Sequence, residues 1–334
     1  MTVLTRAASL TNYAEVARRV GLNPSQMLRR IDLPAAALTD PDLRIPAGKV
    51  GALLERTALE SGCLTIGLQM AESRRISDFG AVSLLLTHQP TLRNVLNTTI
   101  EYLHVLNESL AMHIEDAGDL VIIREEIVSA PGRSTRQATE LAVGVLFRMF
   151  RALLGTHWKP YSVNFTHAAP PDLAVHKRLF GLKVAFNSEF SGIVCEARDL
   201  DRDNPAADPV MARYAKQFVE AMPGAARHSI TQEVRKTIYL LLPRGRATLE
   251  QVAAGLGANS RTLQRQLEEA QTSFSELLDS VRRDLAVRYM NNPSHSLTQI
   301  GEMLGFSHSS AFSRWYSAQF GNSPARDRRT RARK

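Results

Sequence analysis

Two short runs of polar side chains near the carboxyl end of the chain are spaced to lie along one face of a helix. The first run holds Arg261, Gln264 and Arg265, and the second extends from His308 to Arg314. Arginine binds guanine, and glutamine binds adenine, through two hydrogen bonds each, so a helix with this exposed face suits the major groove of DNA. The residues expected at such an interface are Ser260, Arg261, Gln264, Arg265, His308, Ser309, Ser310, Ser313 and Arg314.

The two runs occupy matching positions in an internal repeat. The segments TLEQVAAGLGANSRTLQRQL and SLTQIGEMLGFSHSSAFSRWY align residue by residue up to Gly257 and Gly305. Each copy opens with Thr or Ser three residues before Gln, which predicts a reciprocal N-cap, and its glycine predicts the end of the first helix. We therefore expect two helices joined by a tight turn in each copy, with a small residue, Ala253 or Gly301, where the helices cross.

A single longer helix is predicted between the two copies. It opens with a capping box at Ser273 and Glu276 and stops at Asn292, which precedes a proline. We expect it to hold the two recognition helices in fixed positions, so that they enter successive major grooves roughly 34 Å apart. The residues expected to orient backbone amides toward phosphates are Thr248, Ser296 and Ser307.

The positive charge of the chain is confined to its last third. Residues 225–334 hold 17 Lys and Arg against 9 Asp and Glu, whereas residues 1–224 hold 24 of each kind. A basic segment beside a neutral one indicates a nucleic-acid-binding module, because neutralising phosphates releases counterions. The arginine-rich end, from Arg326 to Lys334, is equally consistent with a tail that maintains solubility. An alternative function is a non-enzymatic architectural or RNA-binding protein that uses the basic third without sequence readout.

The hydrophobic periodicity predicts two domains. Residues 1–224 are expected to form an α+β domain with a small antiparallel sheet, and residues 225–334 an all-α domain of two helix-turn-helix motifs joined by a long helix. A hairpin that turns at Ala117 and Gly118 is predicted over 109–128, and a hinge over 223–226 before a capped helix at Ser229. The other predicted elements are helices at 13–20, 24–31, 46–60, 91–107, 134–154 and 206–221, and strands at 160–167, 182–187 and 192–197.

Several other classes of protein find little support in the sequence. No stretch approaches the ~18 apolar residues of a membrane span, and the amino-terminal segment lacks the apolar core of a secretory signal, so we expect a cytoplasmic protein.

The nine histidines form no i, i+4 pair, and no nucleotide-binding or serine-hydrolase motif is present, so no metal, cofactor or catalytic residue is expected. A DNA-repair alkyltransferase would need reactive cysteines in a setting that Cys63 and Cys195 lack. The carboxylate clusters Glu125–Glu126 and Asp199, Asp201 and Asp203 are expected to be solvated or to cap helices.

Residues 1–224 are therefore expected to bind a small molecule. The candidates are polar residues that interrupt apolar helices, and an inward arginine among them would suit a ligand that carries a carboxylate. Equally, these residues can face solvent or a partner subunit, and His104 alone fits a packing role. The candidate effector-binding residues are Tyr102, His104, Asn107, Arg148 and Arg151.

The carboxyl-terminal third resembles the DNA-binding domain of the AraC/XylS transcription regulators. The resemblance depends on LxxVAxxLGxxxRTLQRxL at 249–267, FxELLxxVRRDLAxRY at 274–289, and a third motif from Ile300 to Arg328. Residues 44–55, 90–115 and 202–214 resemble, more loosely, the arabinose-binding-like sensor domain of some of these regulators. The resemblance implies a sequence-specific regulator of transcription, more often an activator, controlled by a small-molecule effector. Its implied partners are double-stranded DNA, RNA polymerase and a second copy of the chain.

The second recognition helix departs from the family pattern. Family members usually have a small residue, then Phe and one or two basic residues after the arginine that Arg314 matches, whereas this chain has Trp315, Tyr316, Ser317 and Ala318. The second helix is therefore expected to hold fewer phosphates. Its exposed side chains are also short, so we expect Arg261, Gln264 and Arg265 of the first copy to make more of the base contacts.

Overall fold

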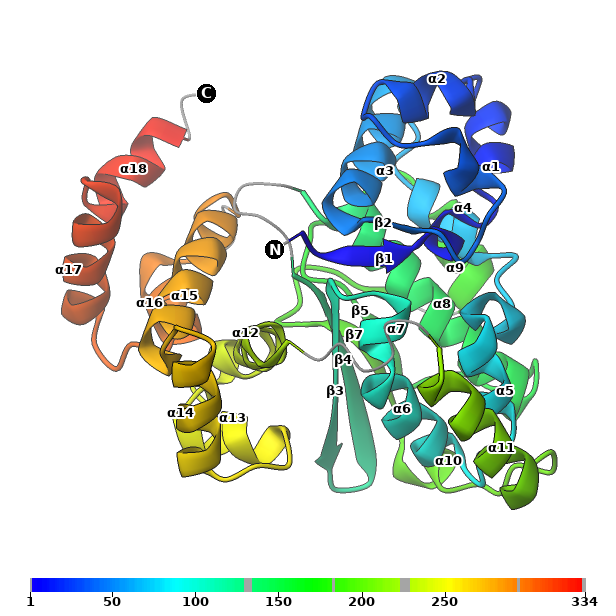
Figure 1. The fold of residues 1–334 in the computed structure, drawn as a ribbon. Coiled ribbons are helices and arrows are strands. Elements are labelled where there is room, and N and C mark those ends of the chain that lie inside the picture. Colours follow the sequence, from blue (N-terminus) through cyan, green and yellow to red (C-terminus); the bar gives the residue numbers. More distant parts are fainter. Residues whose placement is uncertain (1, 129–133, 182–183, 223–228, 293–294, 332–334) are drawn as a thin grey trace. The chain divides into compact units, whose positions relative to one another are not determined.

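The computed structural model describes residues 2–128, 134–181, 184–222, 229–292 and 295–331. These residues divide into two compact units, one formed by the described residues up to 222 and the other by those from 229 onward (Figure 1). The first unit is an α+β fold with a small sheet and the second is entirely helical, so the predicted fold class is confirmed.

A five-stranded sheet organises the first unit. Its strand order is β3-β4-β7-β5-β6, and each neighbouring pair is antiparallel except β5 and β6, which are parallel. The predicted hairpin is confirmed as β3 and β4, which turn at Gly118 with a φ of +71°. The strands are β3 (Leu110–Ala117), β4 (Leu120–Ile127), β5 (Ser162–Asn164), β6 (Val184–Ala185) and β7 (Ser191–Glu196).

Helices of this unit pack against the sheet, and a second, two-stranded sheet of β1 (Leu4–Arg6) and β2 (Arg44–Pro46) lies near the start of the chain (Figure 1). The two-stranded sheet and the shorter helices α4, α5 and α9 were not predicted from the sequence. The α-helices of this unit are α1 (Tyr13–Arg19), α2 (Pro24–Arg29), α3 (Ala47–Ser61), α4 (Ile66–Ala71), α5 (Ala81–Thr87), α6 (Leu92–Glu101), α7 (Leu103–Leu106), α8 (Arg136–Leu154), α9 (Ala174–Phe180), α10 (Ala197–Leu200) and α11 (Pro209–Glu220). Its 3-10 helices are η1 (Ala7–Leu10), η2 (Ala35–Leu38) and η3 (Ile76–Phe79).

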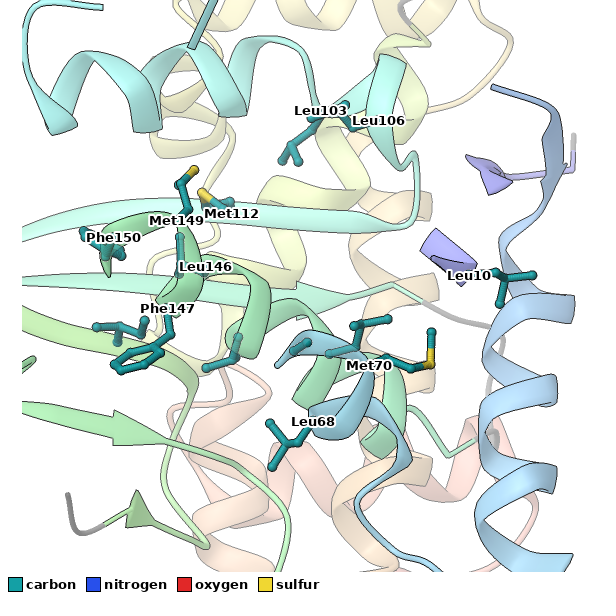
Figure 2. Packing of buried hydrophobic residues seen from close by; sticks show 14 of the residues in the cluster. Leu10, Leu68, Met70, Leu103, Leu106, Met112, Leu146, Phe147, Met149 and Phe150 are labelled. Atoms are coloured by element: carbon teal, nitrogen blue, oxygen red, sulfur yellow. The ribbon is translucent and has the colours of Figure 1, made fainter. Parts of the chain in front are cut away.

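The core of this unit forms around α8, which packs against α4, β4 and β7. Figure 2 shows Leu146, Phe147, Met149 and Phe150 of α8 beside Met112 of β3, all of them buried. The helix α4 lies very close to α8 on the side away from the sheet. A Cβ placed on Gly67 of α4 would lie 2.0 Å from a backbone oxygen of α8, so only glycine fits this crossing.

The predicted helix over 91–107 is interrupted, and that part of the prediction was wrong. The chain forms α6 and α7 with a break at Tyr102, whose φ of −101° and ψ of 12° leave the helical region. The guanidinium of Arg44 donates to the carbonyl oxygens of His104 and Val105, beyond the break. A distant side chain thus supplies donors for carbonyls near the end of α7, which the local sequence does not reveal.

The second unit contains two pairs of short helices and the long α15 that connects them (Figure 1). The predicted helix-turn-helix pairs and connecting helix are therefore present, whereas α18 was expected only as a basic tail. The helices are α12 (Ile230–Leu241), α13 (Leu249–Gly255), α14 (Ser260–Glu269), α15 (Phe274–Met290), α16 (Leu297–Met303), α17 (Ser309–Phe320) and α18 (Pro324–Arg331), with the 3-10 helix η4 (Leu242–Arg244) after α12.

The caps that the sequence predicts are present at the starts of α12, α13, α15 and α16. Ser273 and Ser296 each form a complete capping box with the Glu or Gln three residues later. Ser229 caps α12 by accepting from the amide of Gln232. Thr248 accepts from the amide of Gln251 at 3.3 Å, but its cap does not include a bond from the Thr248 amide to the Gln251 side chain. Only half of the predicted reciprocal N-cap therefore forms there.

Candidate functional site

The first recognition helix, α14, separates an apolar face from a polar one. Leu263 and Leu267 are buried, and the side chains of Arg261, Gln264 and Arg265 are consequently exposed. Ser260 is half-buried at the start of the helix. Asn259, which the sequence analysis did not single out, caps the helix by accepting from the amide of Thr262 at 2.8 Å.

Arg265 is free to exchange its partner. Its side chain is 72% exposed and pairs only loosely with Glu269, 3.8 Å from Nε to the carboxylate oxygen. Exposed pairs of this kind contribute little to stability, typically less than about 1 kcal/mol. A guanine base or a phosphate could therefore replace Glu269 at small cost.

The second recognition helix, α17, is built in the same way with shorter side chains. Phe312 is buried, while Ser309, Ser310 and Arg314 are exposed and Ser313 is half-buried. His308 occupies the N-cap position without a side-chain capping bond, and both it and Ser307 are exposed. The polar face of α17 thus presents three serines and one arginine.

The turns between the helices use the predicted glycines. Gly257 and Gly305 have φ values of +66° and +75°, the left-handed conformation that glycine adopts most easily. The close crossing in the second motif is also confirmed, because a Cβ on Gly301 would lie 3.2 Å from the Cβ of Phe312.

Three polar contacts that the sequence did not reveal fix α15 in the second unit. Asp284, 8% exposed, accepts from the Tyr239 hydroxyl at 2.6 Å and pairs with Arg235, which ties α15 to α12. Burial raises the pKa of Asp284, although both partners favour its charged form. On the other side, Arg282 donates from Nε to the carbonyl oxygen of Leu304 at 3.1 Å. Polar contacts therefore join α15 both to α12 and to the end of α16.

Comparison with known families agrees with this architecture. Residues 21–204 match the model for the arabinose-binding domain of AraC transcription regulators, and residues 252–330 match a helix-turn-helix domain model. The chain belongs to the AraC transcription regulators. DNA binding and the regulation of transcription follow from this membership.

Regulators from other bacteria are similar to this chain over most of its length. The HTH-type transcriptional regulator VirS of Mycobacterium tuberculosis is 28% identical over 323 residues, which are 96% of this chain and 95% of VirS. The ornithine utilization regulator of Pseudomonas aeruginosa is 25% identical over 266 residues, 78% of this chain and 77% of that protein. The crystal structure of the transcriptional regulator CdpR from Pseudomonas aeruginosa covers 91% of this chain and 96% of its own, with 18% identity and a TM-score of 0.43.

The residues that depart from the AraC/XylS pattern on α17 have a packing role. Tyr316 is fully buried and donates its hydroxyl to Asp327 of α18 at 2.6 Å. The ring of Trp315 packs on Phe306, with 5.4 Å between their centroids. In the same helix α18, Arg328 points inward and donates to the carbonyl oxygen of His295, so this part of the expected tail is structured.

The candidate effector residues of the AraC-type sensor domain fall into two groups with separate partners. Tyr102 and His104 are buried and stack at 6.2 Å, and Asn107 accepts from the hydroxyl of Ser109 at 2.7 Å. Arg148 donates to the carbonyl oxygen of Arg74 at 3.4 Å. Arg151 donates to the carbonyl of Thr156, with its guanidinium 5.7 Å from the ring of Phe147.

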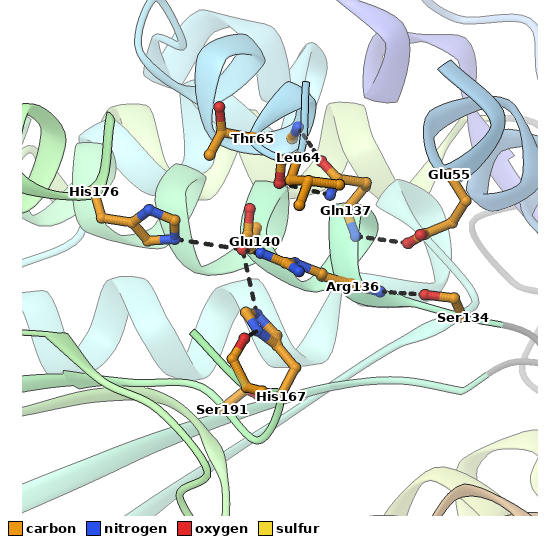
Figure 3. A network of polar contacts seen from close by, with 12 residues as sticks. Glu55, Leu64, Thr65, Ser134, Arg136, Gln137, Glu140, His167, His176 and Ser191 are labelled. Carbon is orange, nitrogen blue, oxygen red and sulfur yellow. Dashed lines mark hydrogen bonds and ion pairs between the residues drawn. The ribbon is translucent and has the colours of Figure 1, made fainter. Parts of the chain in front are cut away.

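The most unusual polar cluster of this unit was missed by the sequence analysis. Glu140 of α8 is completely buried, and one of its oxygens, Oε1, lies 3.3 to 3.4 Å from Arg136 Nε, His167 Nε2 and His176 Nε2 (Figure 3). We refer to Arg136, Glu140, His167 and His176 as the Glu140 network. In the sequence, Arg136 and Glu140 look like an ordinary i, i+4 pair on a solvated helix face, and the two histidines are far away.

The expectation that Glu125 is solvated was wrong. It lies on β4 with its side chain 4% exposed, and burial raises its pKa to about 8. Asp199 and Asp201 are used structurally, since they accept from the Trp158 indole at 2.8 Å and from Arg93 at 2.7 Å.

Both cysteines are free thiols, and Cys195 is buried, which raises its pKa to about 12. Across the described ranges, no three His, Cys, Asp or Glu side chains are grouped as a metal site requires. Those ranges likewise contain no helix that combines the length and apolar composition of a membrane crossing.

Proposed function

We propose that this AraC-type regulator recognises a specific DNA sequence with α14 and α17 and responds to a small molecule bound by its amino-terminal domain. The observation that carries the proposal is the exposure of Arg261, Gln264 and Arg265 on one face of α14. Their backbone is held by buried leucines on the opposite face. Side chains so presented match the donor and acceptor pattern of base edges in a major groove.

The two helices have different roles in this proposal. Residues of α14 make most of the base contacts, whereas the short side chains of α17 and Arg314 provide additional contacts in the next groove. Phosphate contacts come from the amides near Thr248, Ser296 and Ser307. Residues 1–224 form the effector-sensing domain and residues 225–334 the DNA-binding domain.

An effector would act by shifting the population of arrangements in which both helices grip DNA. Family membership supports further parts of the proposal, namely activation rather than repression, contact with RNA polymerase, assembly as a homodimer and a cytoplasmic location. The name of one relative, the ornithine utilization regulator, links that protein to an amino acid. For the present chain we likewise propose an effector that is a metabolite of about the size of an amino acid.

Selection of duplexes from a random pool by the full chain tests the DNA-binding proposal. We expect one enriched motif of about 17–20 bp, because two helices one turn apart contact successive grooves. The triple variant Arg261→Ala, Gln264→Ala, Arg265→Ala is expected to lose the part of the motif that α14 contacts. Enrichment of no motif would instead favour an architectural or RNA-binding function.

A further inference from the structure

The Glu140 network contains buried polar atoms that have no partner in the described part of the chain. They are Glu140 Oε2, Arg136 Nη2, His176 Nδ1 and His167 Nε2, although the last of these lies 3.3 Å from Glu140 Oε1. Glu140 and His176 are at most 1% exposed, and a buried polar atom that makes no hydrogen bond destabilises the folded state. Such atoms in a native protein require an explanation, and a bound ligand, ion or water supplies one by completing their hydrogen bonds.

The chemistry of these atoms defines what they can bind. The Nε2 atom of His176 faces the Glu140 carboxylate and therefore carries the proton, which leaves Nδ1 as an acceptor. The Nη2 group of Arg136 can only donate. A complementary ligand must thus offer an acceptor to Arg136 and an N–H or O–H donor to His176.

The guanidinium of Arg136 favours an anionic acceptor on the ligand. Arg136 pairs through Nε with Glu140 Oε1 at 3.3 Å, and its Nη2 is left without a hydrogen-bond partner among the described residues. A carboxylate on the ligand would accept from this Nη2 through a charge-assisted hydrogen bond, which is stronger than a bond to a neutral acceptor.

Apolar and polar groups surround the network on its other sides. The ring of Phe186 lies 5.3 Å from that of His176 and 5.8 Å from that of His167, and Phe165 stacks on His167 at 5.1 Å. Phe165 and Phe186 supply an apolar surface suited to a short side chain. Figure 3 shows Ser191 of β7 next to His167.

A second buried carboxyl group lies one strand away. Glu125 of β4 is the register partner of Ser191, whose hydroxyl contacts Thr166 next to His167. Its Oε2 also lacks a partner within the described residues. The polar network thus extends from α8 toward the sheet, in the interior of the domain.

We infer that the Glu140 network is a binding site for a small carboxylate that carries an amino or hydroxyl group next to its carboxylate. The ligand's carboxylate would accept from Arg136, and its amino or hydroxyl group would donate to His176 and Glu140. The inference rests on the proposed control by a small molecule and specifies the site and the ligand class. It differs from the residues that the sequence suggested, because neither Arg148 nor Arg151 belongs to the network.

Calorimetric titration of the full chain tests this site with defined probes. The probes are the common L-amino acids with L-ornithine, the hydroxy acids L-lactate and glycolate, and two controls, acetate and L-arabinose. We expect at least one amino acid or hydroxy acid to bind, and neither acetate nor L-arabinose to bind. Comparison of the amino acids with the hydroxy acids shows whether the donor on the ligand is an amino or a hydroxyl group. Binding of L-arabinose alone, or of no probe at all, would overturn the inference.

Variants of Arg136 and Glu140 test whether the bound probe occupies the Glu140 network. Arg136→Met and Glu140→Gln are each expected to weaken the bound probe at least tenfold, and Arg19→Met, which removes an exposed arginine paired with Glu15, is expected to leave it unchanged. Unaltered binding by both network variants would overturn the assignment of the site. Thermal unfolding shows whether each variant is folded. Because Arg136 and Glu140 are changed in separate variants, the second variant still tests the site if the first does not fold.

DNA selection with the same preparations separates this inference from the proposed function. A chain that enriches a motif but binds no probe retains the DNA-binding proposal and loses the ligand site. A chain that binds a probe through Arg136 and Glu140 but enriches no motif retains the site and loses the DNA-binding proposal.

Discussion

Arg282 of α15 donates its Nε hydrogen to the carbonyl oxygen of Leu304, 3.1 Å away, at the end of α16. Its guanidinium also lies 4.7 Å from the centre of the Phe306 ring. The contact joins the connecting helix to the turn that precedes the second recognition helix. It is therefore a direct polar connection between the long helix and the second helix-turn-helix motif.

Arg282→Met should loosen the second motif. The substitution removes the hydrogen bond and the contact with the aromatic ring but keeps most of the apolar stem, and we expect a loss of about 1–3 kcal/mol in stability. Affinity for a duplex with both half-sites should fall more than affinity for a duplex with only the α14 half-site. Fluorescence anisotropy on the two duplexes measures this, with the exposed Arg283→Met as a control. Equal losses on both duplexes would show that Arg282 does not act through the second motif.

Arg265→Ala should reduce discrimination between DNA sequences. We expect a cost of roughly 1–3 kcal/mol on the selected duplex, because a bidentate contact with a base edge is lost. Affinity for random DNA should change much less. The Ala substitution of Glu269, its loose partner, is a matched control that should not weaken specific binding. If both duplexes lost affinity equally, Arg265 would contact a phosphate.

Gly67→Ala should destabilise the amino-terminal domain strongly. The new Cβ would lie 2.0 Å from the backbone oxygen of Gln137, so α4 and α8 would have to separate. Gly51→Ala is the matched control in α3, where the added Cβ has no neighbour within 4 Å and should stabilise the helix by roughly 0.5–1 kcal/mol. Thermal unfolding of both variants checks that Gly67→Ala lowers the melting temperature and that Gly51→Ala raises it. An unchanged transition for Gly67→Ala would mean that the two helices do not pack in this way.

Glu125 should make the stability of the protein dependent on pH. Burial raises its pKa from 4.5 to about 8, so its contribution is fully present below about pH 4.5 and is lost as the pH rises through 8. Each pKa unit corresponds to about 1.4 kcal/mol, and Glu125→Gln removes this penalty. The melting temperature of the variant relative to the wild type should therefore rise by several degrees between pH 5 and pH 8.5. A constant difference would indicate that Glu125 ionises normally.

The sequence predicted the second unit well because local rules determine its elements. Capping residues such as Ser273 and Ser296, left-handed glycines and an i, i+3, i+4 apolar stripe act within a few residues of each other. For the same reason the exposed face of α14 could be listed residue by residue. The helix α18 was not predicted, because it is rich in arginine and its packing depends on the distant Tyr316 and on a carbonyl at His295.

The amino-terminal domain was harder to predict because long-range contacts override local patterns. The carbonyls near the end of α7 accept from Arg44, about 60 residues earlier in the chain, and the close contact of Gly67 in α4 with α8 has no local signal. Glu140 was missed for a similar reason. Its neighbours His167 and His176 come from a loop and from α9, and only the folded chain brings them to one carboxylate oxygen.

The most direct test of the DNA-binding mechanism is the affinity of the full chain for its selected duplex before and after insertion of about 5 bp between the half-sites. Half a helical turn places the second half-site on the opposite face of the duplex. If α15 holds α14 and α17 in fixed positions, affinity should fall at least tenfold, to that of a duplex with one half-site. Unchanged affinity after the insertion would contradict the fixed arrangement of the two recognition helices.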